Sequence, residues 1–197
     1  MSGDKFLGQP DHATPLLPGE MRHLRLPIMG RQQLNAAEAA NVAAGQFWGA
    51  KSRKSQWTEE FLSLLHKRMF GDVWKWAGRY RKHDVNIGDV PAWRVETDVR
   101  SILDDAGYWA ENATYPPHEL AVRLHHRLVF VHPFVNGNGR CTRMLADIVL
   151  IRMKAEPLTW GGVSLVETGV LRADYISALQ AADANDIGPL LRFAQRN

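Results

Sequence analysis

Apolar residues recur at helical spacing over most of this chain. Two early segments show the pattern clearly, with apolar or small residues on one face at Leu34, Ala37, Asn41, Val42 and Gly45 and then at Phe61, Leu62, Leu65 and Met69. Thr58 precedes the second stripe and is a residue type that caps helix N-termini, whereas Gly71 follows it and favours an end. We therefore expect helices over residues 32–47 and between Thr58 and Gly71.

Further helices are expected in the second half. Thr97 precedes an apolar face at Val99, Ile102, Leu103 and Ala106, and Pro116-Pro117 precedes leucines at 120, 124 and 128. Residues 140–153 are apolar on nearly all sides, which is typical of a buried central helix. Residues 172–183 and 187–195 are expected to form two closing helices.

The segment from Asp84 to Val95 has a different period. Val85 and Ile87 alternate with polar residues, Gly88-Asp89 suits a two-residue turn, and apolar positions resume at Val90. Pro91 cannot donate to a ladder, so the second strand is expected to be an edge or broken strand. The predicted fold is mainly α with one small β-hairpin.

Composition changes this picture little. The length of 197 residues suits one domain with a modest extension, and residues 1–30, with four prolines and no apolar period, are expected to be an irregular arm. The 24 Lys and Arg are interleaved with 21 Asp and Glu, so charge gives only weak support for nucleic-acid binding. No apolar run approaches the ~20 residues that span a bilayer, and no signal pattern is visible. A cytoplasmic protein without a membrane anchor is expected.

The chemistry is concentrated between two apolar helices, in His132-Pro133-Phe134-Val135-Asn136-Gly137-Asn138-Gly139-Arg140. Gly137-Asn138-Gly139 lets successive backbone N–H groups face one concavity, and the helix that follows adds its positive end, which suits phosphates. Arg140 and Arg143 are three residues apart and share a helix face. His132 titrates near neutrality and is suited to take a proton from a hydroxyl. These residues predict phosphoryl or nucleotidyl transfer.

Each of these features also has a simpler interpretation. The glycines would otherwise build only a turn and His132 would be a core residue, but burying two arginines without an anion is costly. Cys141, the single cysteine, is interpreted as a small packed residue. A metal cluster of His118, His125, His126 and His132 is disfavoured because adjacent histidines point apart on a helix. The tryptophans at 74, 76, 93 and 109 are interpreted as core and hairpin support.

The loop resembles the signature of the Fic family, His-Pro-Phe-x-(Asp/Glu)-Gly-Asn-Gly-Arg-x-x-Arg, at every fixed position but one. The segments Trp76–Arg81 and Tyr175–Leu179 are also similar to family members, and the chain looks closest to the short group called mobile mystery protein B. The resemblance covers roughly residues 55 to 195. We therefore expect three parts: the irregular arm at 1–30, an N-terminal helix with a potential regulatory role at 31–54 and, from the resemblance, a Fic domain at 55–197.

The resemblance implies protein adenylylation, in which AMP moves from ATP, with Mg²⁺, to a Ser, Thr or Tyr hydroxyl of a target protein. His132 would be the general base, and Phe134 would pack in the core. The residues that would hold the ATP phosphates are Gly137, Asn138, Gly139, Arg140 and Arg143. The hairpin would be a flap that binds the target backbone by strand addition, through Ile87, Gly88, Asp89 and Val90.

Two positions depart from the family pattern. Asn136 stands where Asp or Glu usually binds Mg²⁺, and an amide oxygen adds no negative charge. Many Fic enzymes are inhibited by Ser/Thr-x-x-x-Glu-Gly/Asn, but Leu34 and Ala39 flank Glu38 here. We interpret Glu38 as a solvated helix residue, with an inhibitory pairing to Arg143 as the alternative.

Two other functions stay open. The loop fits phosphates better than it fits a base, so a Fic-type transferase could move phosphate or another nucleotide. The chain could also be a catalytically weak binding protein, associated with an antitoxin, with nucleic acid or with itself. Asn136 is the residue that raises this second alternative.

Overall fold

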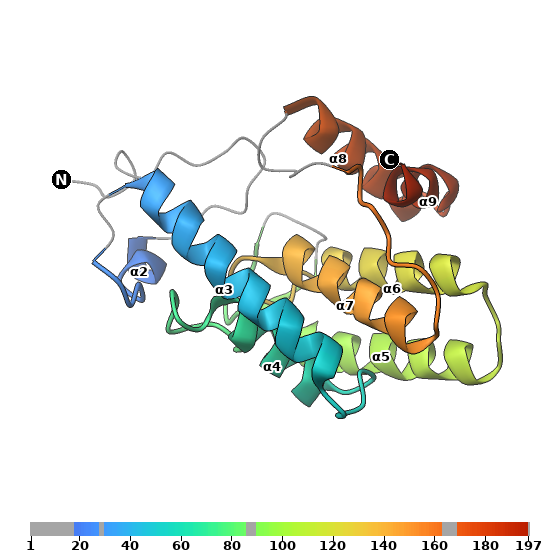
Figure 1. The fold of residues 1–197 in the computed structure, drawn as a ribbon, viewed down its shortest axis with the longest axis horizontal. Coiled ribbons are helices and arrows are strands. Elements are labelled where there is room, and N and C mark those ends of the chain that lie inside the picture. Colours follow the sequence, from blue (N-terminus) through green and yellow to red (C-terminus); the bar gives the residue numbers. More distant parts are fainter. Residues whose placement is uncertain (1–17, 28–29, 86–89, 163–168, 197) are drawn as a thin grey trace.

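The computed structural model describes residues 18–27, 30–85, 90–162 and 169–196. The described chain is mainly helical, as predicted (Figure 1). Its elements are α2 (Pro18–Met21), α3 (Arg31–Lys51), α4 (Glu59–Phe70), η1 (Ala92–Arg94), α5 (Val95–Glu111), α6 (Pro117–Val131), α7 (Asn138–Arg152), α8 (Gly169–Asp183) and α9 (Gly188–Gln195).

Local sequence explains where several helices begin and end. Thr58 caps α4, where its hydroxyl accepts from the Phe61 N–H at 3.2 Å, and Glu59 and Glu60 lie in the positive first turn. Gly71 follows the last turn, and a Cβ there would come 2.4 Å from the Lys67 carbonyl oxygen. Both predicted ends of this helix are therefore confirmed.

Helix α7 is the central helix that its apolar sequence predicted. One face joins the larger core, between α3, α4, α5 and α6, through Cys141, Leu145, Ile148 and Val149. The other face packs with α8 and α9 through Ala146 and Leu150. Figure 1 shows α3 crossing the bundle diagonally, with α8 and α9 grouped at one end. Because α7 is held on both sides, its N-terminal end is fixed in the interior.

The predicted β-hairpin is not confirmed. Within the described ranges no sheet forms, and the pairing consists of isolated bridges, Leu24 with Trp74 and Tyr80 with Phe134. The expected second strand is wrong from Ala92 onward, because η1 and then α5 occupy those residues. Pro91 precedes a helical turn, where its missing N–H costs nothing. Residues 86–89 lie outside the described ranges, so the predicted turn is not tested.

The structure also tests the predictions about the tryptophans and about membrane-spanning helices. Trp74 and Trp76 are buried as expected, whereas Trp93 is 81% exposed and does not belong to the core. Among the described residues, no helix combines the length and apolar character needed to cross a membrane.

Candidate active site

His132 lies at the point where α6 ends. It adopts the left-handed conformation (φ 52°, ψ 59°), which turns the chain sharply into the loop. The residue is only 7% exposed. The backbone N–H of His132 still bonds to the Leu128 carbonyl at 3.1 Å, so the residue is fixed to the end of the helix.

The hydrogen bonding of the His132 ring sets its tautomer. Nδ1 lies 3.1 Å from the Val129 carbonyl oxygen, which can only accept, so Nδ1 carries the proton and Nε2 carries the lone pair. Burial is the main cause that lowers the pKa of His132 to about 4; the Val129 hydrogen bond opposes this shift and the charge of Arg81 adds to it. The ring is therefore neutral at pH 7, which is the form that a general base requires.

The loop after His132 is held from inside. Asn138 Oδ1 accepts from the Phe134 N–H at 2.8 Å, and Asn138 Nδ2 donates to the Phe134 carbonyl at 2.8 Å. Phe134 is fully buried, as expected, and stacks on His66 at 3.8 Å between ring centroids. The Asn138 side chain therefore shapes the loop, and only its backbone N–H is left to meet a phosphate.

His66 supports the other end of the loop. Its Nδ1 accepts from the Gly78 N–H at 2.9 Å, so Nε2 carries the proton and donates to the Asn136 carbonyl at 2.9 Å. Burial lowers the pKa of His66 to about 3, which keeps the ring neutral. One imidazole thus links α4 and the loop.

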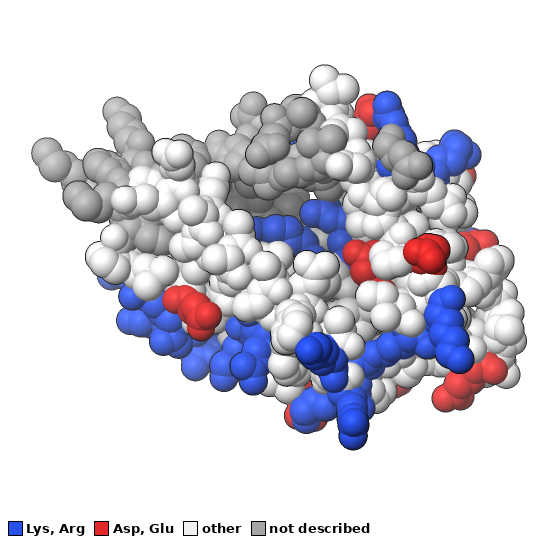
Figure 2. All heavy atoms as spheres, viewed as in Figure 1, with Lys and Arg blue, Asp and Glu red and all other residues white. Residues whose placement is uncertain are grey.

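Gly137 makes the entry into α7 possible. It has φ 77°, and a Cβ there would lie 2.7 Å from the Phe70 ring. The first backbone N–H groups of α7 have no acceptor within the helix, and they form its positive end. The face drawn in Figure 2 is hollowed near its centre, and Lys or Arg atoms line the floor of the hollow. This arrangement suits a polyanion such as a triphosphate.

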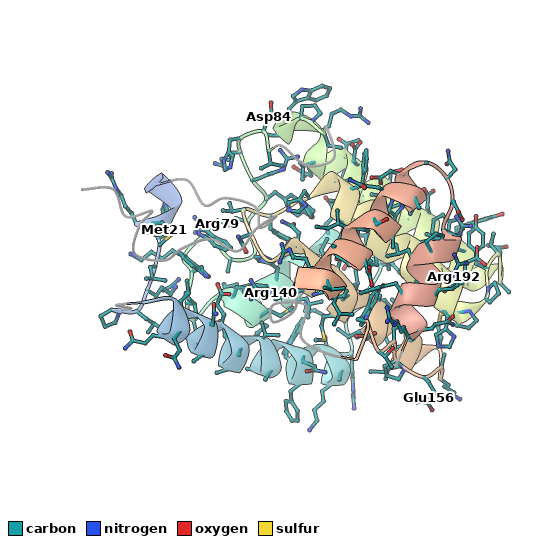
Figure 3. All side chains as sticks on the ribbon, turned by 90° about the horizontal axis from the view of Figure 1, so that it is seen from above. Met21, Arg79, Asp84, Arg140, Glu156 and Arg192 are labelled. Carbon is teal, nitrogen blue, oxygen red and sulfur yellow. The ribbon has the colours of Figure 1, made fainter. Side chains whose placement is uncertain are left out.

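Arg140 is paired with a residue from α3. Its Nη1 lies 2.7 Å from Glu38 Oε2, and Glu38 Oε1 accepts from Trp74 Nε1 at 2.7 Å. The Glu38 side chain is 13% exposed, so its interpretation as a solvated residue is wrong. The alternative prediction, that Glu38 pairs with Arg143, is also wrong, because the Glu38 carboxylate pairs with Arg140. Figure 3 shows Arg140 near the middle of the molecule.

Arg143 is oriented by a chain of hydrogen bonds that leads back to the loop. Its guanidinium donates to the Tyr175 hydroxyl, which lies 2.9 Å from His125 Nε2. His125 Nδ1 lies 2.9 Å from Thr142 Oγ1, and Thr142 donates to the Asn138 carbonyl at 2.9 Å. Since the last acceptor, the Asn138 carbonyl, can only accept, each hydrogen bond of this series donates in the direction from Arg143 to Asn138. Burial lowers the pKa of both Arg143 and His125.

Tyr175→Phe tests this chain. The substitution leaves His125 Nε2 as a buried acceptor without its donor, which costs about 1–3 kcal/mol, and it removes an acceptor from Arg143. We expect a lower melting temperature together with weaker ATP binding, measured by thermal unfolding and calorimetry. Tyr108→Phe, at an exposed tyrosine, is the control. Unchanged ATP affinity in Tyr175→Phe would show that the chain does not orient Arg143 for phosphate.

Metal ligands are sparse at this site. Asn136 Oδ1 lies 3.5 Å from Arg140 Nη2 and offers a neutral oxygen. In the part of the chain that the structure describes, no group of three His, Cys, Asp or Glu side chains is placed to hold a metal ion. Cys141 is buried in the core, and burial raises the pKa of its thiol, as expected for a packed residue.

The sequence pattern missed the residues that support the site from a distance. His66 and Arg81 contact the loop, Tyr175 contacts Arg143, and His125 connects Tyr175 to Thr142. A buried polar side chain on an apolar helix face was the available signal for His66 and His125, since such groups require partners. Of the predicted flap residues, Ile87, Gly88 and Asp89 lie outside the described ranges, and Val90 is buried.

Curated relatives are similar to this chain over about two thirds of its length. The chain is 30% identical over 136 residues to "Protein adenylyltransferase fic-1" of Caenorhabditis elegans, which is 68% of this chain and 25% of that protein. It is 31% identical over 137 residues to "Protein adenylyltransferase Fic" of Nematostella vectensis, or 67% of this chain and 30% of that protein. The chain thus matches less than a third of the length of either relative.

Solved structures share the fold. Fic-1 (residues 134–508) from C. elegans superposes with a TM-score of 0.67 at 25% identity, over 92% of this chain and 55% of that one. BepC from Bartonella tribocorum, with bound AMPPNP, gives a TM-score of 0.67 at 16% identity, over 98% and 96% of the two chains. The model of the Fic/DOC family matches residues 56–150, which include α4 to α6, most of α7 and the whole loop. The chain therefore belongs to the Fic/DOC family.

Proposed function

We propose that this chain is a protein adenylyltransferase that moves AMP from ATP to a Ser, Thr or Tyr hydroxyl. One observation carries the proposal: a neutral His132, with its lone pair on Nε2, precedes a helix N-terminus that carries two arginines. Relatives that are 30–31% identical to this chain over about two thirds of its length are named protein adenylyltransferases. The nucleotide named for BepC, AMPPNP, has the triphosphate length that the arginines suggest.

The proposed reaction has one bond-forming and one bond-breaking event. His132 Nε2 takes the proton of the target hydroxyl, whose oxygen attacks the α-phosphorus of ATP. The bond from the α-phosphorus to the bridging oxygen of the β-phosphate breaks, and pyrophosphate leaves. The N-terminal amides of α7, with Arg140 and Arg143, would hold the β- and γ-phosphates and stabilise the charge that develops on them.

Mg²⁺ fits this site only with help from the nucleotide. Asn136 Oδ1 would be a ligand from this chain, and as a neutral oxygen beside a guanidinium it attracts a hard cation weakly. The phosphates of ATP and water would supply the other ligands. When bound, the metal would neutralise phosphate charge, whereas the chain itself binds and orients the nucleotide.

Asn136→Asp is expected to lower the Mg²⁺ concentration for half-maximal labelling and to raise the turnover, because a carboxylate adds an anionic ligand. The measurement is a Mg²⁺ titration of the labelling rate. Asn185→Asp adds the same charge at an exposed turn and serves as the control. An unchanged Mg²⁺ requirement would mean that this position does not bind the metal.

Incubation with ATP labelled at the α- or the γ-phosphate tests the reaction itself. Adenylylation leaves the α label, and a mass increase of AMP, on protein. Retention of the γ label alone would instead indicate phosphate transfer, and another mass increment would identify another nucleotide. If no label is retained with Mg²⁺ or Mn²⁺ in a lysate, the enzyme proposal fails and the binding-protein alternative gains support.

The target would be another protein, bound along the flap by Ile87, Gly88, Asp89 and Val90. Support comes from the position of the flap ends, since Val90 and His83 both contact Arg81, which in turn contacts the His132 carbonyl. A backbone bound there would lie beside the base. Cytoplasmic residence accords with this proposal, because ATP and unmodified protein hydroxyls are both abundant in that compartment.

A further inference from the structure

Arg81 is a buried cation at the junction of the catalytic loop and the described ends of the flap segment, residues 82–85 and 90–91. Its side chain has no exposed surface. The partners of its guanidinium are mostly backbone carbonyls, and an arginine in the core of a small protein needs such partners to offset the loss of water. Burial lowers the pKa of Arg81, and the nearby Asp84 opposes that shift.

On one side Arg81 holds the end of α6. Its Nε donates to the His132 carbonyl at 2.8 Å, and Nη2 donates to the Val131 carbonyl at 3.2 Å. Its own backbone N–H donates to the Pro133 carbonyl at 2.9 Å. Three consecutive carbonyls around the base are therefore fixed by one residue.

On the other side Arg81 holds both described ends of the flap segment. Nη1 donates to the His83 carbonyl at 2.8 Å, and Nη2 donates to the Val90 carbonyl. Asp84, labelled in Figure 3, also connects the two described ends of the flap segment. Its Oδ1 accepts from the Ala92 N–H at 2.7 Å and lies 3.8 Å from Arg81 Nη1. The planar fork of arginine can serve all these acceptors at once, which a lysine ammonium cannot.

We infer that Arg81 is a positioning residue that sets the positions of the two described flap ends, residues 82–85 and 90–91, relative to His132. This role of Arg81 in catalysis rests on the proposed function, since a target bound along the flap would present its hydroxyl to His132 only in one register. The role is additional to that function, because the link between the target-binding segment and the general base then depends on one buried arginine.

If Arg81 had only a structural role, substitution would have different effects. A cation that only satisfied carbonyls would affect folding stability and nothing specific at His132. The positive charge of Arg81 lowers the pKa of His132, beyond the effect of burial and against the Val129 hydrogen bond. Two substitutions can therefore separate the effect of the Arg81 charge from the effect of its forked guanidinium.

The experiment compares Arg81→Lys with Arg81→Gln. By NMR titration, the pKa of His132 should rise in Arg81→Gln only by the part of the shift that the Arg81 charge causes, because burial still lowers it, and it should stay unchanged in Arg81→Lys, which keeps the charge. In both variants, hydrogen exchange of the Ala92 amide should accelerate more than exchange in α7, since both lose the fork. Labelling with α-labelled ATP should fall in both, whereas the calorimetric affinity for ATP should stay within a few-fold of the parent.

Arg152→Gln is the matched control. Arg152 also donates to loop carbonyls, those of Ser52 at 2.7 Å and Lys54 at 2.8 Å, at the opposite end of α7. It should lower the melting temperature without changing the His132 titration or selectively exposing Ala92. Equal behaviour of Arg81→Gln and Arg152→Gln in all three measurements would overturn the inference. Titration and exchange require no catalysis, so they decide the inference even if no labelling is found in the parent protein.

Discussion

Replacing His132 with Asn is expected to lower the rate of AMP transfer by about 10²–10⁴-fold, the usual contribution of a general base. Asn is preferred to Ala because His132 has φ 52°, a conformation that Asn tolerates well. The Asn amide can also donate to the Val129 carbonyl, so the fold is spared while the basic nitrogen is lost. The measurement is the initial rate of α-label incorporation at saturating ATP.

His118→Asn is the control for this experiment. His118 bonds to the Glu156 carbonyl at 2.9 Å on the surface, at the far end of α6 from the loop. Its rate should equal that of the parent, and ATP affinity should be unchanged in both variants. A His132→Asn protein that folds, binds ATP and labels at the parental rate would remove His132 from the reaction.

The pH dependence of the parent gives a second check on the base. Because the pKa of His132 is lowered to about 4, the ring should stay in its basic form from pH 8 to pH 6, and the rate should fall only as the pH approaches 4. His66, with a pKa lowered to about 3, is also buried and neutral. The unfolded chain binds these protons below about pH 6.5, so stability decreases as the pH falls from there. Circular dichroism at each pH separates unfolding from protonation of the base.

Local signals account for what the sequence predicted well. The Thr58 cap, the stripe of Phe61, Leu62 and Leu65, and the return to helix after Gly137 each depend on residues within one or two turns. The positive φ of Gly137 follows from the same short stretch. The base and the arginines of the site are therefore readable from the order of residues along the loop.

Contacts between distant segments account for what the sequence did not predict. Glu38 and Arg140 are 102 positions apart, and no local pattern indicates that α3 brings its carboxylate to the loop. The hairpin was wrong beyond Ala92 because Val90 to Val95 alternates like a strand, while Glu96 and Asp98 favour the start of a helix and determine the outcome. Arg81 lies in a segment that resembles the family, but its buried carbonyl partners depend on the tertiary packing.

Replacing Glu38 with Gln is expected to increase ATP affinity by about 10–100-fold. Glu38 Oε2 lies 2.7 Å from Arg140 Nη1, where a phosphate oxygen would bind, so ATP must displace the carboxylate. Hydrogen bonds to charged groups contribute about 1.5–3 kcal/mol, which corresponds to that change in dissociation constant. Labelling at low ATP concentration should rise with the affinity.

Gln is the sharper substitution because it retains the second contact of this side chain. A Gln Oε1 can still accept from Trp74 Nε1, which keeps α3 attached to the core, whereas Glu38→Gly also removes that bond and weakens the helix. Glu60→Gln, which breaks an exposed pair with Lys54 at 2.7 Å, is the matched control and should leave ATP affinity unchanged. Calorimetry with ATP measures the affinity directly. Equal affinity in Glu38→Gln and the parent would mean that the carboxylate only holds α3 in place, whereas a large gain would make the α3 helix an inhibitory element that acts through Arg140.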